Sequence, residues 1–167
     1  MKKIFFILIF NFLYLSHILA QVQEILPSGV APAGADVAFT EQWLAFANPA
    51  TLGRAESVVA SVGYENRYFA PELSDEYLLV AVPTKYFNVG ASFNFFGYAD
   101  YHEMMAALTV ARRFGIVAFG VEFDYFNMFL PDEVGYRHAF TAQVGLQVDV
   151  TEQCVLGFRM FNPSFSQ

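Results

Sequence analysis

The chain has 167 residues, a length that suits one domain. Hydrophobic residues make up 56% of it and aromatic residues 18%, whereas charged residues make up only 15%. Soluble domains average roughly 25% charged residues, so this composition excludes intrinsic disorder and disfavours an ordinary soluble domain. The net charge of −7 argues against a nucleic-acid-binding surface. The single cysteine, Cys154, excludes an internal disulfide.

The first twenty residues have the layout of a secretory signal peptide. Lys2 and Lys3 precede an apolar run from Ile4 to Leu15, and Ala20 is a plausible cleavage residue. We therefore expect residues 1–20 to be removed on export. The alternative is an uncleaved N-terminal anchor.

The rest of the chain predicts strands rather than membrane-spanning helices. Its longest charge-free run, Tyr86–Ala99, falls short of the roughly 18 apolar residues that a spanning helix needs. Apolar residues instead alternate with small or polar ones, as in 87–95, 117–125 and 140–150. This period of two predicts seven strands, at 56–68, 75–83, 86–97, 102–113, 115–127, 136–149 and 152–162.

The pattern favours an antiparallel transmembrane β-barrel, in which apolar residues face lipid and the small or polar ones face the lumen. The connections after the second, fourth and sixth predicted strands are short, and those after the first, third and fifth are longer, as in outer-membrane barrels. The alternative is a secreted β-sandwich, whose solvent face would normally carry more Lys and Glu.

Seven charged or amide residues fall on the predicted lumen face. They could set the selectivity for ions or solutes, or they could simply be solvated, or pair with one another or with the N-terminal segment. These candidates are Glu65, Glu122, Asp124, Gln143, Gln147, Asp149 and Arg159. An aromatic girdle is expected at the long-loop ends of the strands, formed by Tyr64, Tyr68, Phe96, Tyr98, Tyr101, Tyr125 and Phe126.

Residues 21–54 lack period two and are expected to form a periplasmic or lumen segment, with a short helical stripe that ends at Asn48-Pro49. Here the chain resembles a family. Gly34-Ala35, Trp43–Phe46 and Asn48-Pro49-Ala50-Thr51-Leu52 before the first strand are similar to the PorV/PorQ-type, FadL-like outer-membrane proteins of Bacteroidetes, and so is the later Phe161–Pro163.

This resemblance implies a barrel of about fourteen strands, with the N-terminal segment plugging or capping the lumen, and a role in type IX-like protein secretion or in transport of hydrophobic or small solutes. Because single-chain bacterial barrels have an even number of strands, residues 55–167 are expected to be the N-terminal half of a larger barrel. A complete eight-strand barrel is the alternative.

The sequence predicts no catalytic, cofactor-binding or metal-binding residues. His102 lies near Asp100 and Glu103, and His138 near Asp132 and Glu133, so an enzyme acting on lipid or peptide at the barrel rim is one alternative. A small structural or binding barrel without a channel is another. The expected location is the outer membrane of a Gram-negative bacterium, with membrane lipid, secretion-system proteins or a hydrophobic ligand as partners.

Overall fold

The computed structural model describes residues 38, 45, 47–66, 69–131 and 135–162. In the described part of the chain, no helix is long and apolar enough to cross a membrane. The elements are η5 (Pro49–Arg54), β1 (Val59–Asn66), η6 (Pro71–Leu73), β2 (Ser74–Pro83), β3 (Asn88–Gly97), β4 (His102–Phe114), β5 (Val117–Leu130), β6 (Gly135–Thr151) and β7 (Cys154–Phe161).

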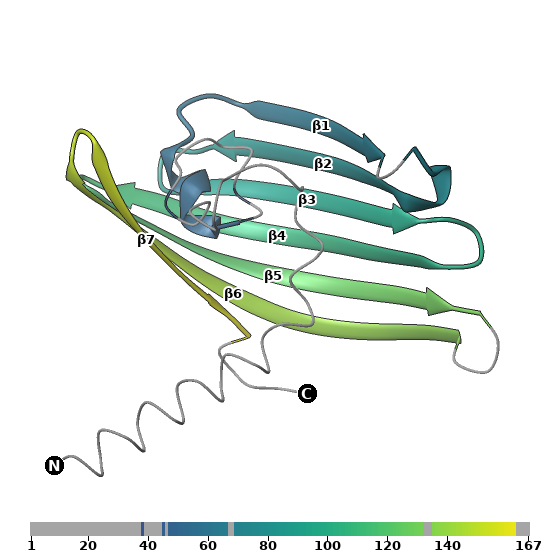
Figure 1. The fold of residues 1–167 in the computed structure, drawn as a ribbon. Coiled ribbons are helices and arrows are strands. Elements are labelled where there is room, and N and C mark those ends of the chain that lie inside the picture. The colour runs from purple at the N-terminus through teal and green to yellow at the C-terminus, as the bar shows by residue number, and fades with distance from the viewer. Residues whose placement is uncertain (1–37, 39–44, 46, 67–68, 132–134, 163–167) are drawn as a thin grey trace, which may run out of the picture.

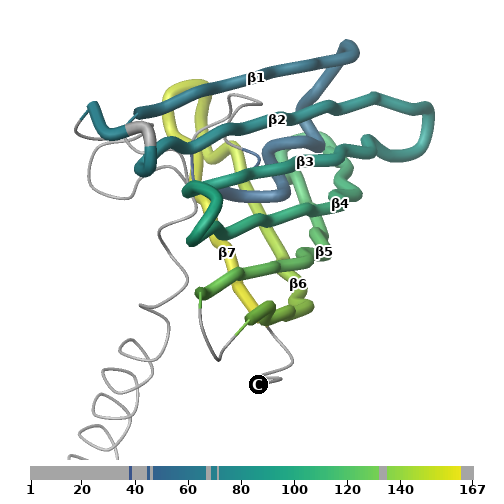
Figure 2. The backbone as a smooth tube through the Cα atoms, turned by 90° about the vertical axis from the view of Figure 1, so that its right-hand side faces the viewer, coloured from purple at the N-terminus to yellow at the C-terminus, as the bar shows by residue number. Residues whose placement is uncertain are grey.

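The seven strands form one antiparallel sheet in the order β1-β2-β3-β4-β5-β6-β7, so every strand pairs with its neighbours in the sequence. The sheet curls into a half-barrel, as Figures 1 and 2 show. The prediction of an all-β fold with seven strands is confirmed, and the predicted bounds are within a few residues of those observed. β1 and β7 are the two edges of the sheet.

The two shortest connections lie at the same end of the sheet. The connections at that end span 84–87, 115–116 and 152–153. Those at the other end span 67–73, 98–101 and 131–134. We call these the short-turn end and the long-loop end. The tightest turn depends on Gly115, whose φ of +58° suits a residue without a Cβ.

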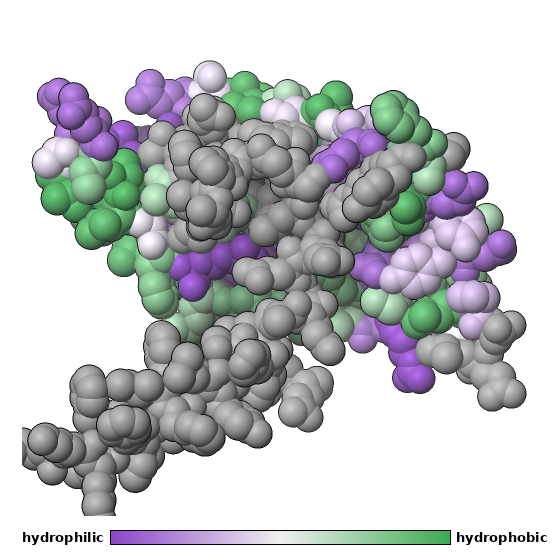
Figure 3. All heavy atoms as spheres, viewed as in Figure 1, coloured by the Kyte–Doolittle hydropathy of each residue, from purple (hydrophilic) through white to green (hydrophobic). Residues whose placement is uncertain are grey.

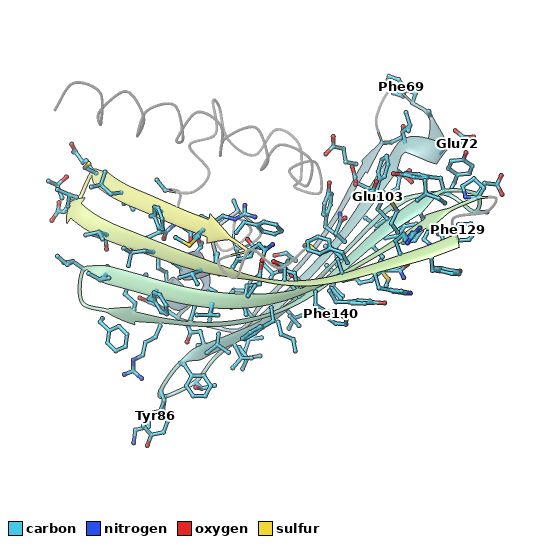
Figure 4. All side chains as sticks on the ribbon, turned by 90° about the horizontal axis from the view of Figure 1, so that it is seen from below. Phe69, Glu72, Tyr86, Glu103, Phe129 and Phe140 are labelled. Carbon is cyan, nitrogen blue, oxygen red and sulfur yellow. The ribbon has the colours of Figure 1, made fainter. Side chains whose placement is uncertain are left out.

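The two faces of the sheet differ in chemistry. Along β5, Ala118, Gly120, Glu122 and Asp124 are buried on the concave face, while the residues between them point to the convex face. In Figure 3 hydrophilic atoms lie in the middle of the concave face. Figure 4 shows Phe140 pointing away from the convex face, where it is 75% exposed. Other exposed apolar residues of this face include Val62, Val80, Leu108, Val110, Phe119, Phe123, Leu156 and Phe158.

A small apolar core occupies part of the concave face. Leu52 of η5 belongs to it together with Tyr77, Leu79 and Ala81 of β2 and Met105 of β4. β2 carries apolar residues on both of its faces, because its inward residues pack in this core with Leu52 of η5. Phe126 also packs against this core, so the prediction that it belongs to an outer girdle is wrong.

β7 pairs with only part of β6. Its partners run from Gln143 to Thr151, with a bulge between Asp149 and Thr151. Beyond β7, Asn162 has a φ of +46°, and its N–H donates to the carbonyl of Ala142. The 135–141 part of β6 therefore has no β7 residue beside it among the described residues.

Candidate functional site on the concave face

The Asn-Pro-Ala motif begins the short helix η5. Asn48 is extended, and its side-chain Oδ1 accepts a hydrogen bond from the N–H of Ala50 at 3.0 Å. Pro49 follows at the first helical position, where its missing N–H has no partner to lose. Both residues are the expected start signals for η5, and the helical stripe predicted before them lies largely outside the described residues.

η5 lies on glycines of neighbouring strands. Gly120 of β5 pairs directly with Gly145 of β6, and an ideal Cβ on Gly120 would lie 2.6 Å from the nitrogen of Ala50. A Cβ on Gly145 would lie 2.9 Å from the same nitrogen. On β3, a Cβ on Gly90 would lie 2.5 Å from Leu52 Cδ2. Real Cβ atoms do not come this close to other atoms, so the close approach of η5 explains why these three positions are glycines. We call Gly90, Gly120 and Gly145 the glycine seat.

Buried amides hold the backbone of η5 and its flanks. Asn88 of β3 donates from Nδ2 to the carbonyls of Leu52 and Ala55, each at 2.8 Å. Asn48 donates in turn to the carbonyls of Leu146 and Phe158, each at 3.4 Å. The chain on both sides of η5 is thus bonded to β3, β6 and β7, which satisfies polar groups that burial would otherwise leave unpaired.

The C-terminal end of η5 is held by charge. Arg54 binds the Asp149 carboxylate with two nitrogens, at 2.6 and 3.1 Å, and donates from Nε to Gln147 at 2.8 Å. Arg113 binds the same carboxylate at 2.7 Å, and Gln147 also donates to the Thr51 hydroxyl at 3.1 Å. A forked arginine–carboxylate pair fixes orientation as well as distance. We call the glycine seat, these amides and these ion pairs the η5 anchor.

A second polar group lies further along the concave face. Gln143 donates to Glu122 at 3.1 Å and to Asp124 at 2.8 Å, and the Thr109 hydroxyl donates to Glu122. Glu122, Asp124 and Gln143 are all nearly inaccessible to solvent. We call Thr109, Glu122, Asp124 and Gln143 the acidic row. It joins β4, β5 and β6, and it shows that the polar side chains pair across strands.

All seven predicted lumen candidates fall on the concave side by the alternation of their strands. Five of them belong to these two groups: Gln147 and Asp149 to the η5 anchor, and Glu122, Asp124 and Gln143 to the acidic row. Arg159 donates to the carbonyl of Ala47 at 3.3 Å, and Glu65 is half-buried on β1. These seven residues are Glu65, Glu122, Asp124, Gln143, Gln147, Asp149 and Arg159.

Sequence reasoning missed Arg54, Asn88 and the glycine seat. The signal for the seat was present: glycines on the small face of three of the predicted strands. What the sequence lacked was the register, because only the pairing of Gly120 with Gly145 reveals one common surface.

The two histidines lie away from the concave polar groups, in an aromatic stack at the long-loop end. His102 lies between Phe95 and Phe129, with ring centroids 5.5 and 5.3 Å away. His138 Nδ1 lies 2.7 Å from the Tyr125 hydroxyl and 2.8 Å from Asn127 Nδ2. Asp132 and Glu133, the acids expected near His138, lie outside the described residues, as does Tyr68 of the expected girdle.

Near this stack, Tyr101 donates to the Glu103 carboxylate. Burial, and then the hydrogen bond and charge of Glu103, raise the pKa of Tyr101 to about 12. Glu103 is therefore engaged with Tyr101, which lies in the 98–101 connection.

Comparison with known proteins gives no match to a family model, a curated protein or a solved structure.

Proposed function

We propose that this protein is an outer-membrane β-barrel of the PorV/PorQ-like type, with a role in protein secretion or solute transport. The observation that carries the proposal is the distribution of polarity on the sheet: polar residues line its concave face and apolar residues cover its convex face. A soluble half-barrel would present the opposite arrangement, since its convex face would meet water. Lipid is the environment that suits exposed Phe123, at 62%, and Phe140, at 75%.

The η5 anchor supports the second part of the proposal, that the N-terminal segment plugs or caps the lumen. Its contacts join η5 to β3, β5, β6 and β7, all near the short-turn end. A segment held by glycine contacts, buried amides and an arginine fork is a fixed part of the barrel. The proposed orientation places the short-turn end in the periplasm and the long loops outside the cell.

The same anchor favours a second candidate, a structural or binding barrel without an open channel. The two candidates differ in whether solute crosses the membrane. Arg54→Gln removes the charge of the fork, and Arg113→Gln is the matched control that contacts Asp149 from outside η5. In liposome swelling, a transporter predicts uptake that Arg54→Gln increases more than Arg113→Gln does. A closed barrel predicts no uptake by the unaltered protein.

Membrane location is tested first. The protein is expected in the outer-membrane fraction, released by detergent but not by high salt, and its gel mobility is expected to change on boiling. Recovery as a soluble protein whose mobility does not change on boiling would refute the barrel and favour a secreted sandwich.

A further inference from the structure

Two charged side chains stand on the convex face of the seven described strands. Strand alternation and register place Glu76 of β2 and Arg112 of β4 on this face. All other charged residues of these strands, such as Glu65, Arg113 and Arg137, fall on the concave face. Arg112 is therefore the one cation on the convex face of the described strands.

The spacing of these two charged residues matches the thickness of a membrane. Through Phe95, Glu76 is in register with Met104 of β4. Nine residues of β4 run from Met104 to Arg112, and a tilted transmembrane strand needs about 9–11. Between these two levels the convex side chains of β4 are Ala106, Leu108 and Val110. Arg112 thus lies at one margin of an apolar band, on the side of the short-turn end.

The Arg112 side chain is directed toward the short-turn end. Its Cζ lies 5.1 Å from the centre of the Phe114 ring, which is two residues nearer the turn. Phe114 is 62% exposed, and Phe119, the register partner of Arg112 on β5, is 43% exposed. Long cationic side chains on lipid-facing surfaces bend in this way, so that the charge reaches the interface while the stem stays on apolar surface.

The neighbouring turn repeats the arrangement. Lys85 Nζ lies 5.4 Å from the centre of the Tyr86 ring. Figure 4 shows Tyr86 at the tip of the β2–β3 connection, projecting away from the concave face. Cations and exposed aromatic rings together are typical of the membrane–water interface.

No described carboxylate forms an ion pair with Arg112. Arg113, the next residue, binds Asp149 together with Arg54, and both of these ion pairs lie on the concave side. The convex face near Arg112 offers aromatic rings but no negative charge within the described strands. An arginine is costly in the middle of a lipid bilayer and is accepted near its surface, where anions are present. The anion for Arg112 therefore has to come from outside the chain.

We propose that Arg112 binds the phosphate of a phospholipid in the membrane leaflet at the short-turn end, with Phe114 and Phe119 against the glycerol and the upper acyl chains. This inference rests on the proposed function. The planar guanidinium presents its N–H groups as a fork that matches two phosphate oxygens. The exposed rings on either side favour a lipid over free phosphate, which would leave them uncovered.

The first experiment measures the contact itself. The protein, with ¹³C at arginine Cζ, is folded into vesicles of phosphatidylethanolamine and phosphatidylglycerol, and solid-state NMR records the dephasing of the Cζ signal by ³¹P. We expect dephasing in the unaltered protein, loss of most of it in Arg112→Gln, and its retention in Arg137→Gln, the control on the concave face. Absence of dephasing in the inserted protein, or equal dephasing in Arg112→Gln, would overturn the inference.

The second experiment asks whether the phosphate stabilises the fold. Urea midpoints are compared in the same vesicles and in micelles of dodecyl maltoside, which has no phosphate. We expect Arg112→Leu to lower the midpoint in vesicles and to have a smaller effect or none in micelles. Arg112→Lys should lie between, because lysine keeps the charge and loses the fork.

A cation that lipid merely accommodates gives the opposite result. Leucine suits an apolar surface better, so Arg112→Leu would then leave the midpoint in vesicles unchanged or raise it. Either outcome, or an equal fall in vesicles and micelles, would overturn the inference. If inorganic phosphate added to the micelles restored the full difference between Arg112→Leu and the unaltered protein, the site would bind free phosphate and the lipid would be refuted.

Flotation of the same samples with the vesicles separates the two proposals. Unaltered protein that does not float with vesicles would refute the proposed function. Unaltered protein that floats and whose arginine signals show no effect of lipid phosphate would refute the role of Arg112 alone.

Discussion

Two buried asparagines on β3 allow a sharp test of the η5 anchor. Asn88 donates two hydrogen bonds of 2.8 Å to the carbonyls of Leu52 and Ala55. Asn94 lies on the same face of the same strand and is fully buried, and neither of its side-chain polar atoms has a hydrogen-bond partner among the described residues. The two residues thus share chemistry, strand and burial, and differ in whether they bind η5 and its flank.

Asn88→Ala should destabilise the protein strongly. Each lost hydrogen bond is worth about 1 kcal/mol net, and leaving two carbonyls buried without partners adds to that loss. We expect the free energy of unfolding to fall by about 2–4 kcal/mol. Asn94→Ala removes a desolvated amide that makes no hydrogen bond, and leaves a small cavity. Its free energy of unfolding should stay within about 1 kcal/mol of the unaltered protein.

The assay is urea unfolding in lipid vesicles, followed by far-ultraviolet circular dichroism. Thr51→Cys, in a Cys154→Ser background, serves as a reporter, because Thr51 belongs to η5 and is fully buried. Asn88→Ala should speed thiol labelling at this position, and Asn94→Ala should not. Equal losses for the two variants, or faster labelling with Asn94→Ala, would refute the argument that these hydrogen bonds hold η5.

Three further predictions follow from other contacts. Gly120→Ala should lower the free energy of unfolding by about 1–3 kcal/mol because its Cβ would meet the backbone of η5, whereas Ala91→Val on the convex face should change it by less than about 0.5 kcal/mol, both by urea unfolding. Phe123→Lys should destabilise the protein by about 2–4 kcal/mol in vesicles if the convex face meets lipid, and the control Phe123→Leu should not; a neutral Phe123→Lys would contradict the membrane proposal. Tyr101→Phe should remove a tyrosinate step near pH 12 from the ultraviolet titration. Since the folded-state pKa of Tyr101 exceeds the ordinary value of 10, its contribution to stability is complete below pH 10 and is lost as the pH rises toward 12, so stability should fall less steeply in the variant over that range.

The strands and their two faces could be predicted because alternation is a local property. In residues 117–125 successive side chains point to opposite faces of the sheet, so an apolar residue on one face is followed by a small or polar residue on the other. The positions of the connections could be predicted as well, since turns such as that at Gly115 interrupt the alternation of apolar and polar residues. The sequence therefore predicted the polar and apolar faces before any strand was paired.

The η5 anchor could not be predicted in the same way, since it joins residues far apart in the sequence. Arg54 and Asp149 are 95 positions apart, and nothing near either residue indicates the other. The glycine seat likewise exists only once β5 and β6 are in register. The start of η5 was not predicted, because Asn48-Pro49 was interpreted only as the end of a preceding helical stripe, although proline also suits the first turn of a helix.

The position of the glycine seat also bears on where a solute could pass. Glycine weakens a strand interior, so Gly120 and Gly145, which pair with each other, are understandable only because the backbone at the start of η5 packs against them. Removing η5 would expose that level of the sheet and leave Asn88, Gln147 and Asp149 without the partners that η5 and its flanks provide. A segment built in this way is part of the wall. In the proposed barrel any passage would therefore run beside η5 and not through the level of the sheet that η5 fills.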